Sequence, residues 1–224
     1  MVFAEISKVG LGLEQPYPSG WSYRLAPHLV LSTCLHPGGA DPSGEVLLVK
    51  SGGAFPPGHP TTRLSLDLLR EAMAAGPVRR LLDVGCGAGV LSLAAAALRV
   101  PRVVGLDIAR RAALATRENA RANSLAGAIL VAAQGSTECV KGPFDLVLAN
   151  LPWEVQMEKA AELDRLAAPK GRLIISGFHD NEEKGLFESY HKLGWTLTRR
   201  LVWDFRHPEL PVDMSFTWVA WLLA

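Results

Sequence analysis

Hydrophobic and polar residues follow different patterns on either side of about residue 60. Up to that point the chain is rich in Gly and Pro, and β-like runs lie near Tyr23–Thr33 and Val46–Lys50. This pattern predicts a short β-rich lead-in. Beyond it, Leu64, Leu68 and Met73 recur on one helical face, which indicates an amphipathic helix.

Short apolar runs then alternate with helical patterns along the rest of the chain. The strands are expected at Arg80–Val84, Arg102–Asp107, Ala128–Ala132, Asp145–Asn150 and Leu173–Ser176. The helices between them are expected at Val90–Leu98, Arg110–Asn123 and Glu154–Ala167. Alternation of this kind indicates a parallel sheet with helices on both faces.

The C-terminal pattern differs, because the β-rich runs Trp195–Phe205 and Met214–Leu222 are joined by a Pro-containing loop without a helix. Such a pair is expected to be antiparallel and to close one edge of the sheet. The sequence therefore predicts an α/β fold, a Rossmann-like seven-stranded sheet of five parallel strands and an antiparallel terminal pair. Residues 1–60 are expected to form the β-rich N-terminal segment and residues 61–224 the main domain.

The most informative motif, Asp83–Gly89, reads Asp-Val-Gly-Cys-Gly-Ala-Gly between a predicted strand and a predicted helix. We expect Gly85 to make the tight turn, Gly87 to let the backbone approach a ligand, and Gly89 to let the helix pack close to the strand. Asp83 suits hydrogen bonds to the loop amides or to a ligand ammonium. The alternative is a glycine-rich turn without a ligand.

The glycine spacing separates two classes of nucleotide-binding protein. A dinucleotide-binding loop has the spacing Gly-x-Gly-x-x-Gly and brings a helix N-terminus onto a pyrophosphate. Here the third glycine comes one residue early, and Val90 stands where it would fall. This form resembles motif I of S-adenosylmethionine-dependent enzymes, whose ligand has no phosphate.

The next two strand ends offer contacts for a nucleoside. Asp107 ends the second strand and can accept hydrogen bonds from both ribose hydroxyls, or it can cap the following helix, or both. Ile108 follows it. Gly135 and Ser136 come after the third strand, where a backbone amide or the hydroxyl can bond the adenine edge; a plain loop is the alternative.

Asn150-Leu151-Pro152-Trp153 follows the fourth strand and resembles motif IV of amino-methyltransferases, most often Asn/Asp-Pro-Pro-aromatic. Methyl transfer is an in-line displacement, in which the enzyme mainly positions a nitrogen lone pair. An Asn carbonyl can accept from the target N–H, and an aromatic ring can hold a planar or cationic target. Leu151 replaces the first proline, which predicts a less rigid loop. The alternative is a structural turn with Trp153 as a packing residue.

The segment Ala54–Thr62 resembles the Ala-Phe-Gly-Thr-Gly-x-His-x-Thr-Thr segment of ribosomal protein L11 methyltransferases. The resemblance covers about residues 45–180 and implies that Phe55 and Thr61 or Thr62 touch the cofactor. A threonine is also a plausible N-cap for the next helix. His59 is expected to order the segment, and a role as a base is the alternative. The family carries a longer N-terminal domain that grips its protein substrate, which the short lead-in here does not match.

The resemblance implies an S-adenosylmethionine-dependent N-methyltransferase of class I that releases S-adenosylhomocysteine, acts on a protein amino group and uses no metal. Asn150, Pro152 and Trp153 are the expected catalytic residues. The expected cofactor contacts are Phe55, Thr61, Thr62, Asp83, Gly85, Cys86, Gly87, Gly89, Asp107, Ile108, Gly135, Ser136 and Asn150.

Three other functions remain open: an RNA base N-methyltransferase, a small-molecule methyltransferase and a non-catalytic subunit with this fold. The composition bears on these alternatives. A net charge of +1 gives no sign of a field that attracts RNA. The cysteines Cys34, Cys86 and Cys139 lie too far apart for a metal cluster and suit a reducing cytoplasm. No apolar run approaches the roughly 20 residues that span a bilayer, so no membrane association is expected.

Overall fold

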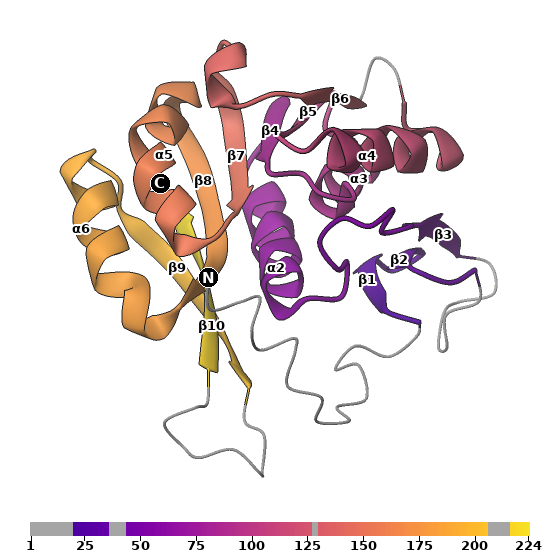
Figure 1. Ribbon diagram of the computed structural model, residues 1–224, viewed down its shortest axis with the longest axis horizontal. Coiled ribbons are helices and arrows are strands. Elements are labelled where there is room, and N and C mark those ends of the chain that lie inside the picture. The colour runs from indigo at the N-terminus through magenta and orange to yellow at the C-terminus, as the bar shows by residue number, and fades with distance from the viewer. Residues whose placement is uncertain (1–19, 36–43, 127–129, 206–215) are drawn as a thin grey trace.

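The computed structural model describes residues 20–35, 44–126, 130–205 and 216–224. It confirms the predicted α/β architecture: a seven-stranded sheet carries helices on both faces, and a three-stranded sheet precedes it in the chain (Figure 1). No helix within these ranges is long and apolar enough to cross a bilayer.

The large sheet has the strand order β6-β5-β4-β7-β8-β10-β9. Its parallel strands are β4 (Arg80–Val84), β5 (Arg102–Asp107), β6 (Leu130–Gln134), β7 (Phe144–Asn150) and β8 (Ala167–His179). The antiparallel pair is β9 (Leu197–Phe205) and β10 (Phe216–Leu223), with β10 paired to both β8 and β9. The chain runs outward from β4 to β6 and returns to β7 on the other side of β4. A switch of this kind opens a crevice at the carboxyl ends of β4 and β7.

Two hydrophobic clusters form around this sheet. One joins α2 (Pro60–Ala75) and α3 (Val90–Ala97) to inward-facing residues of β4, β7 and β8. The other joins α5 (Trp153–Leu166) and α6 (Glu183–Lys192) to the alternate residues of the same strands. Because successive strand residues point to opposite faces, the two clusters cover opposite sides of the sheet, and α4 (Arg110–Ala122) packs on β5 and β6.

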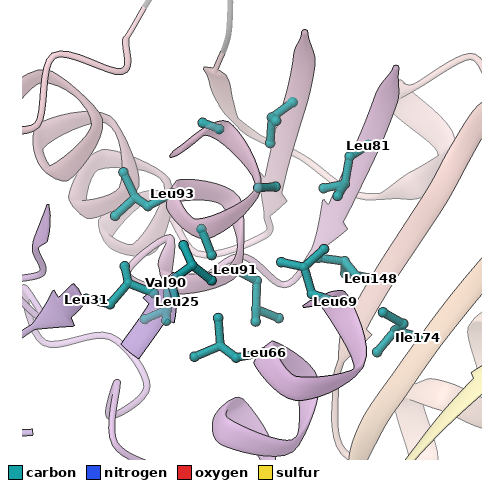
Figure 2. Close-up of a cluster of buried hydrophobic side chains, with 14 of the residues drawn as sticks. Leu25, Leu31, Leu66, Leu69, Leu81, Val90, Leu91, Leu93, Leu148 and Ile174 are labelled. Carbon is teal, nitrogen blue, oxygen red and sulfur yellow. The ribbon is translucent and has the colours of Figure 1, made fainter. Parts of the chain in front are cut away.

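The described part of the N-terminal segment forms β1 (Ser22–Ala26), β2 (Leu29–Ser32) and β3 (Glu45–Leu48), which confirms the β-rich prediction there. Residues 1–19 and 36–43 of the predicted segment lie outside the described residues. Its core is shared with the main domain. Figure 2 shows Leu25 and Leu31 of this sheet in one cluster with Leu66 of α2 and Leu91 of α3. The small sheet therefore packs on the helices that lead into the crevice.

Some element boundaries differ from the prediction. The strand predicted at 128–132 is β6 at 130–134, and residues 128 and 129 lie outside the described part of the chain. β8 is longer than predicted, because pairing with β7 already starts at Ala167, before a bulge in which Lys170 has φ +65°. The pattern does not predict α6, since only Leu186 and Tyr190 are buried in it.

Candidate functional site

The glycine loop after β4 is held against the end of β5. The amides of Gly85 and Cys86 both donate to the carbonyl of Leu106, at 2.8 and 2.9 Å. Gly85 has φ +71°, and a Cβ there would lie 2.4 Å from Cδ2 of Leu151. Glycine at this position therefore makes the predicted turn and also lets the loop after β7 approach the loop after β4.

The other two glycines of the loop have different surroundings. Gly89 has φ +83°, and its Cβ would lie 2.8 Å from Cγ2 of Thr116 on α4. The close neighbour is therefore a helix, and the prediction that Gly89 allows packing against a strand is wrong. A Cβ on Gly87 would meet, among the described residues, only Phe55 Cβ at 3.9 Å. The face of Gly87 is thus open for a ligand to approach the backbone.

Asp83 and Cys86 are buried beneath the loop. Asp83 accepts a hydrogen bond from the Ser92 hydroxyl of α3 at 2.6 Å, so its predicted partner in the glycine loop is replaced by a helix residue. Burial raises the pKa of Asp83 to about 6, against the opposing effect of Ser92. Burial also raises the pKa of the Cys86 thiol, which therefore stays protonated and unreactive.

The acid at the end of β5 accepts two backbone hydrogen bonds. Asp107 Oδ2 accepts from the Gly87 amide at 3.0 Å, and Oδ1 accepts from the Ala109 amide at 2.8 Å. The second bond is the helix-capping contact, while the first connects Asp107 to the glycine loop. Each carboxylate oxygen keeps a further lone pair for a ligand. Ile108 is 76% exposed, so its apolar side chain is available to cover a ligand ring.

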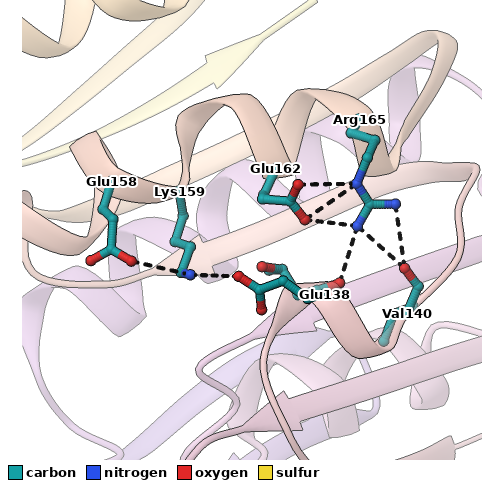
Figure 3. A network of polar contacts seen from close by, with 7 residues as sticks. Glu138, Val140, Glu158, Lys159, Glu162 and Arg165 are labelled. Atoms are coloured by element: carbon teal, nitrogen blue, oxygen red, sulfur yellow. Dashed lines mark hydrogen bonds and ion pairs between the residues drawn. The ribbon is translucent and has the colours of Figure 1, made fainter.

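The loop after β6 lies beside this acid, because the Gly135 amide donates to the backbone carbonyl of Asp107 at 2.9 Å. Ser136 is the N-cap of the short helix η1 (Thr137–Cys139), and its hydroxyl bonds Glu138. Figure 3 shows that side chains of α5 hold this segment in place: Lys159 pairs with Glu138 at 2.8 Å, and Arg165 donates to backbone carbonyls.

Asn150 ends β7 in the crevice beside β4. Its Oδ1 lies 3.0 Å from the hydroxyl of Ser176 on β8, and its Nδ2 lies 3.5 Å from the hydroxyl of Thr62 on α2. Three elements that are distant in the sequence therefore meet at this carboxamide.

The two residues that complete the predicted motif lie at the start of α5. Pro152 is exposed and is the N-cap of α5, and Trp153 is the first residue of that helix. The Trp153 ring packs against the cluster of α5 and α6. Its indole nitrogen is buried and has no hydrogen-bond partner among the described residues. This placement favours the packing alternative for Trp153 over substrate contact.

Residues 50–59 connect β3 to α2; we call them the strap. Phe55 on the strap is 51% exposed. His59, and not a threonine, is the N-cap of α2: its Nδ1 accepts from the Thr61 amide at 3.3 Å and lies 2.8 Å from the Thr61 hydroxyl. The threonine-cap prediction is therefore wrong, while the ordering role of His59 is confirmed. Burial, with a contribution from His179, lowers the pKa of His59 to about 4.

Asn119 of α4 and the C-cap of that helix, Asn123, lie one turn apart and hold the end of β3 and the start of the strap. Asn123 accepts from the Leu48 amide and donates to the Leu48 carbonyl, both at 2.8 Å. Asn119 accepts from the Lys50 amide at 3.1 Å and donates to the Lys50 carbonyl at 2.8 Å. Its second N–H donates to the carbonyl of Ala88 in the glycine loop, at 2.8 Å. One buried carboxamide thus connects the strap to the glycine loop.

A single pocket brings several of the predicted motifs together. It is lined by residues of the strap, the glycine loop, two helices and the ends of β4 and β7: Phe55, Pro56, Pro57, Thr62, Asp83, Gly85, Cys86, Gly87, Ala88, Val90, Leu91 and Asn150. The predicted site residues outside this lining are Thr61, Gly89, Asp107, Ile108, Gly135, Ser136, Pro152 and Trp153. Within the described ranges, no group of three or more His, Cys, Asp or Glu residues could hold a metal ion.

The polar residues that support the site from behind are not among the residues that the sequence predicts. Ser92, Thr116, Asn119 and Ser176 are all buried and bond the motif residues or their loops. The spacing of Asn119 and Asn123, one turn apart on one helical face, is a sequence signal from which their shared role could be predicted. Ser176, at the predicted end of a parallel strand, is another.

The sheet order, the glycine loop and the carboxamide at the β4–β7 crevice define the class of this protein as class I S-adenosylmethionine-dependent methyltransferases. A solved structure of a magnesium protoporphyrin IX methyltransferase from Synechocystis with bound S-adenosylmethionine has the same fold, with a TM-score of 0.59 and 20% identity, covering 71% of this chain and 77% of that one.

The chain belongs to the ribosomal protein L11 methyltransferase (PrmA) family, whose model matches residues 28–203. It is 35% identical to the ribosomal protein L11 methyltransferase of Geobacter metallireducens over 85% of this chain and 65% of that protein. It is 31% identical to the ribosomal protein L11 methyltransferase of Thermotoga neapolitana, over 82% of this chain and 69% of that protein. A ribosomal protein L11 methylase from Lactobacillus delbrueckii has a TM-score of 0.72 at 24% identity, covering 91% of this chain and 97% of that one.

The chain thus spans less than two thirds of the Geobacter protein, and it spans 57% of the relative from Syntrophotalea carbinolica.

Proposed function

We propose that this chain transfers a methyl group from S-adenosylmethionine to an amino group of a protein, with ribosomal protein L11 as the substrate. The observation that carries this proposal is the pocket in which Phe55 and Thr62 face the glycine loop and Asn150. Cofactor loop, strap and a nitrogen-orienting amide meet there, as the family resemblance implies. A ribosomal substrate also places the proposed reaction in the cytoplasm.

The residues at the crevice fit this cofactor. Gly87 leaves open the face that a side chain would fill, and Asp107 keeps lone pairs for the two ribose hydroxyls. Ile108 would cover one face of the adenine, and Gly135 and Ser136 would meet its edge. The buried Asp83 would favour the cationic end of the ligand, since a nearby positive charge stabilises its carboxylate.

S-adenosylmethionine supplies an electrophilic methyl group on a sulfonium. The task of the protein is to place a neutral amine in line with that methyl and to exclude water. The Asn150 carbonyl can accept an N–H of the amine, which orients the lone pair and favours the positive charge that develops on nitrogen. Thr62, 3.5 Å from Asn150, lies where its hydroxyl supports the same carboxamide.

The N-terminal sheet and the strap are proposed to act with the main domain as one unit. The sheet shares a hydrophobic cluster with α2 and α3, and Asn119 connects the strap to the glycine loop. In this view the strap covers the cofactor, and substrate selection depends on surfaces around the strap.

The proposal is tested in two stages. Isothermal titration calorimetry is expected to show binding of S-adenosylmethionine and S-adenosylhomocysteine without added metal. Binding of NAD alone would overturn the class of ligand.

Tritiated S-adenosylmethionine is then incubated with the protein and, in separate reactions, with purified L11, ribosomal RNA or a small-molecule extract. Label in L11, abolished by Asn150→Ala, supports the proposal. Label in RNA or in small molecules alone would replace the protein substrate with that class.

A further inference from the structure

A buried chain of hydroxyl groups leads from the first turn of α2 to Asn150. Ser65 Oγ lies 2.8 Å from the Thr61 carbonyl and 2.6 Å from Ser176 Oγ, which lies 3.0 Å from Asn150 Oδ1. Ser65 is 1% exposed and Ser176 is 0% exposed. The proton positions on this chain are therefore set by protein partners, and they bear directly on the orientation of Asn150.

Counting protons gives two arrangements, because each hydroxyl has one proton to donate. If Ser176 donates to Asn150 Oδ1, Ser65 must donate to Ser176, and the contact between Ser65 and the Thr61 carbonyl holds no proton. If Ser65 donates to that carbonyl, Ser176 donates to Ser65, and the Asn150 carboxamide turns over to present Nδ2 to Ser176. The second arrangement places a proton in all three contacts. The two ends of a carboxamide have nearly the same shape, so the hydrogen bonds decide between them.

We propose that Ser65 and Ser176 are positioning residues that turn the Asn150 carboxamide so that its carbonyl oxygen faces Thr62 and the pocket. This inference rests on the proposed function, in which that oxygen accepts an N–H of the methyl acceptor. In the opposite orientation Nδ2 faces the pocket, so that an N–H of Asn150 and an N–H of the methyl acceptor point toward each other. The Thr61 carbonyl, as a fixed acceptor, gives the chain its direction.

The proposal predicts an unusual order of activities. In Ser65→Ala, Ser176 loses its acceptor, and its buried proton is satisfied only by turning to Asn150 Oδ1, which selects the wrong orientation. Because the correct orientation then leaves a buried donor unpaired, kcat should fall on the order of 10- to 100-fold. In Ser176→Ala the carboxamide is free to follow the substrate, and kcat should fall less, by roughly 3- to 10-fold.

The double variant separates orientation from packing. Adding Ser176→Ala to Ser65→Ala should raise kcat back to the level of Ser176→Ala, while the cofactor Kd stays within about twofold. Packing damage alone would make the double variant equal to or slower than Ser65→Ala, and that result would overturn the proposal. Ser32→Ala is the matched control, because Ser32 is equally buried and bonds the Trp21 carbonyl away from the site.

A spectroscopic measurement tests the orientation without any methyl acceptor. The chain has four asparagines, so ¹⁵N-asparagine labelling gives a resolvable set of side-chain amides, and Asn150→Asp assigns the one in question. In the parent protein a proton on Nδ2 of Asn150 should be protected from exchange by Ser176. In Ser65→Ala its exchange should quicken at least about 10-fold. Equal exchange would overturn the inference even if methyl transfer to L11 is found, and faster exchange would support it even if L11 is not the substrate.

Discussion

Replacing Asn119 by alanine should weaken both the fold and the cofactor site. The Asn119 carboxamide is 3% exposed and makes three hydrogen bonds, two to the backbone of Lys50 and one to the carbonyl of Ala88. The first two hold the strap that carries Phe55, and the third holds the glycine loop. Its removal leaves three backbone groups without this partner, and it separates the two walls of the pocket.

The size of the effect follows from these contacts. A hydrogen bond contributes a net of roughly 0.5–1.5 kcal/mol, so three bonds contribute about 2–4 kcal/mol. For a chain of this length a loss of 1 kcal/mol lowers the melting temperature by about 2–4 °C. We therefore expect Tm to fall by roughly 4–16 °C. A looser strap should also raise the Kd for S-adenosylhomocysteine on the order of 10-fold, because less of the protein holds the closed pocket.

Asn123→Ala is the matched control for this experiment. Asn123 also makes three hydrogen bonds, to the amide and carbonyl of Leu48 and to the Asn119 carbonyl, but none to the glycine loop. Differential scanning fluorimetry should show comparable losses of Tm in the two variants. Calorimetry should show the larger affinity loss only for Asn119→Ala. Equal affinities in the two variants would refute the link between the strap and the glycine loop.

Three further outcomes are expected. Asp107→Ala should raise the Kd of S-adenosylmethionine about 10- to 100-fold, since it removes a charged acceptor and the bond to Gly87; an unchanged Kd in calorimetry would leave only the capping role. Asn150→Ala should lower single-turnover methyl transfer by roughly 100- to 1000-fold with cofactor Kd nearly unchanged, whereas a less stable but fully active variant would contradict its catalytic role. Lowering the pH from 6.5 to about 4 should reduce the free energy of unfolding, because His59 takes up a proton in the unfolded chain at a higher pH than in the native state. Urea titrations should show that the parent protein and His59→Gln differ in how their free energy of unfolding changes over this pH range. Parallel curves for the two proteins would exclude this role for His59.

Local patterns predicted most of the fold. β4 and β5 match their predicted bounds, and α3 and α4 differ by one residue at one end, because a buried strand and an amphipathic helix each have a clear period. Helix α6 is not predicted by its local pattern, because Gly185 lies inside it and only Leu186 and Tyr190 form its buried face. Its position depends on packing against α5 and the sheet, which no local pattern describes.

The residues of the site also fall into two groups, those that a local sequence pattern predicts and those that it does not. Gly85, Asp107 and Asn150 could be found because each comes directly after a recognisable strand, and parallel strands end at one edge of a sheet. The contacts that support them join positions far apart in the chain. Ser65 and Ser176 are separated by 111 residues, and Asn119 and Lys50 by 69. Pairings of this kind depend on how α2 and α4 lie across the sheet, and composition or spacing does not encode them in readable form.

The leucine in the loop after β7 shows why a departure from a motif needs the structure for its interpretation. Proline has no N–H, but the Leu151 amide donates to the Ser176 carbonyl at 3.0 Å, and the Leu151 side chain fills the space above Gly85. Gln156 of α5 donates to that same Ser176 carbonyl at 3.0 Å and to the Ala149 carbonyl. The loop is therefore fixed by hydrogen bonds to β8 and α5 at the position where the usual motif has its first proline ring. The expected loss of rigidity does not follow, because a backbone amide that proline would remove becomes the contact that holds Asn150 beside Ser176.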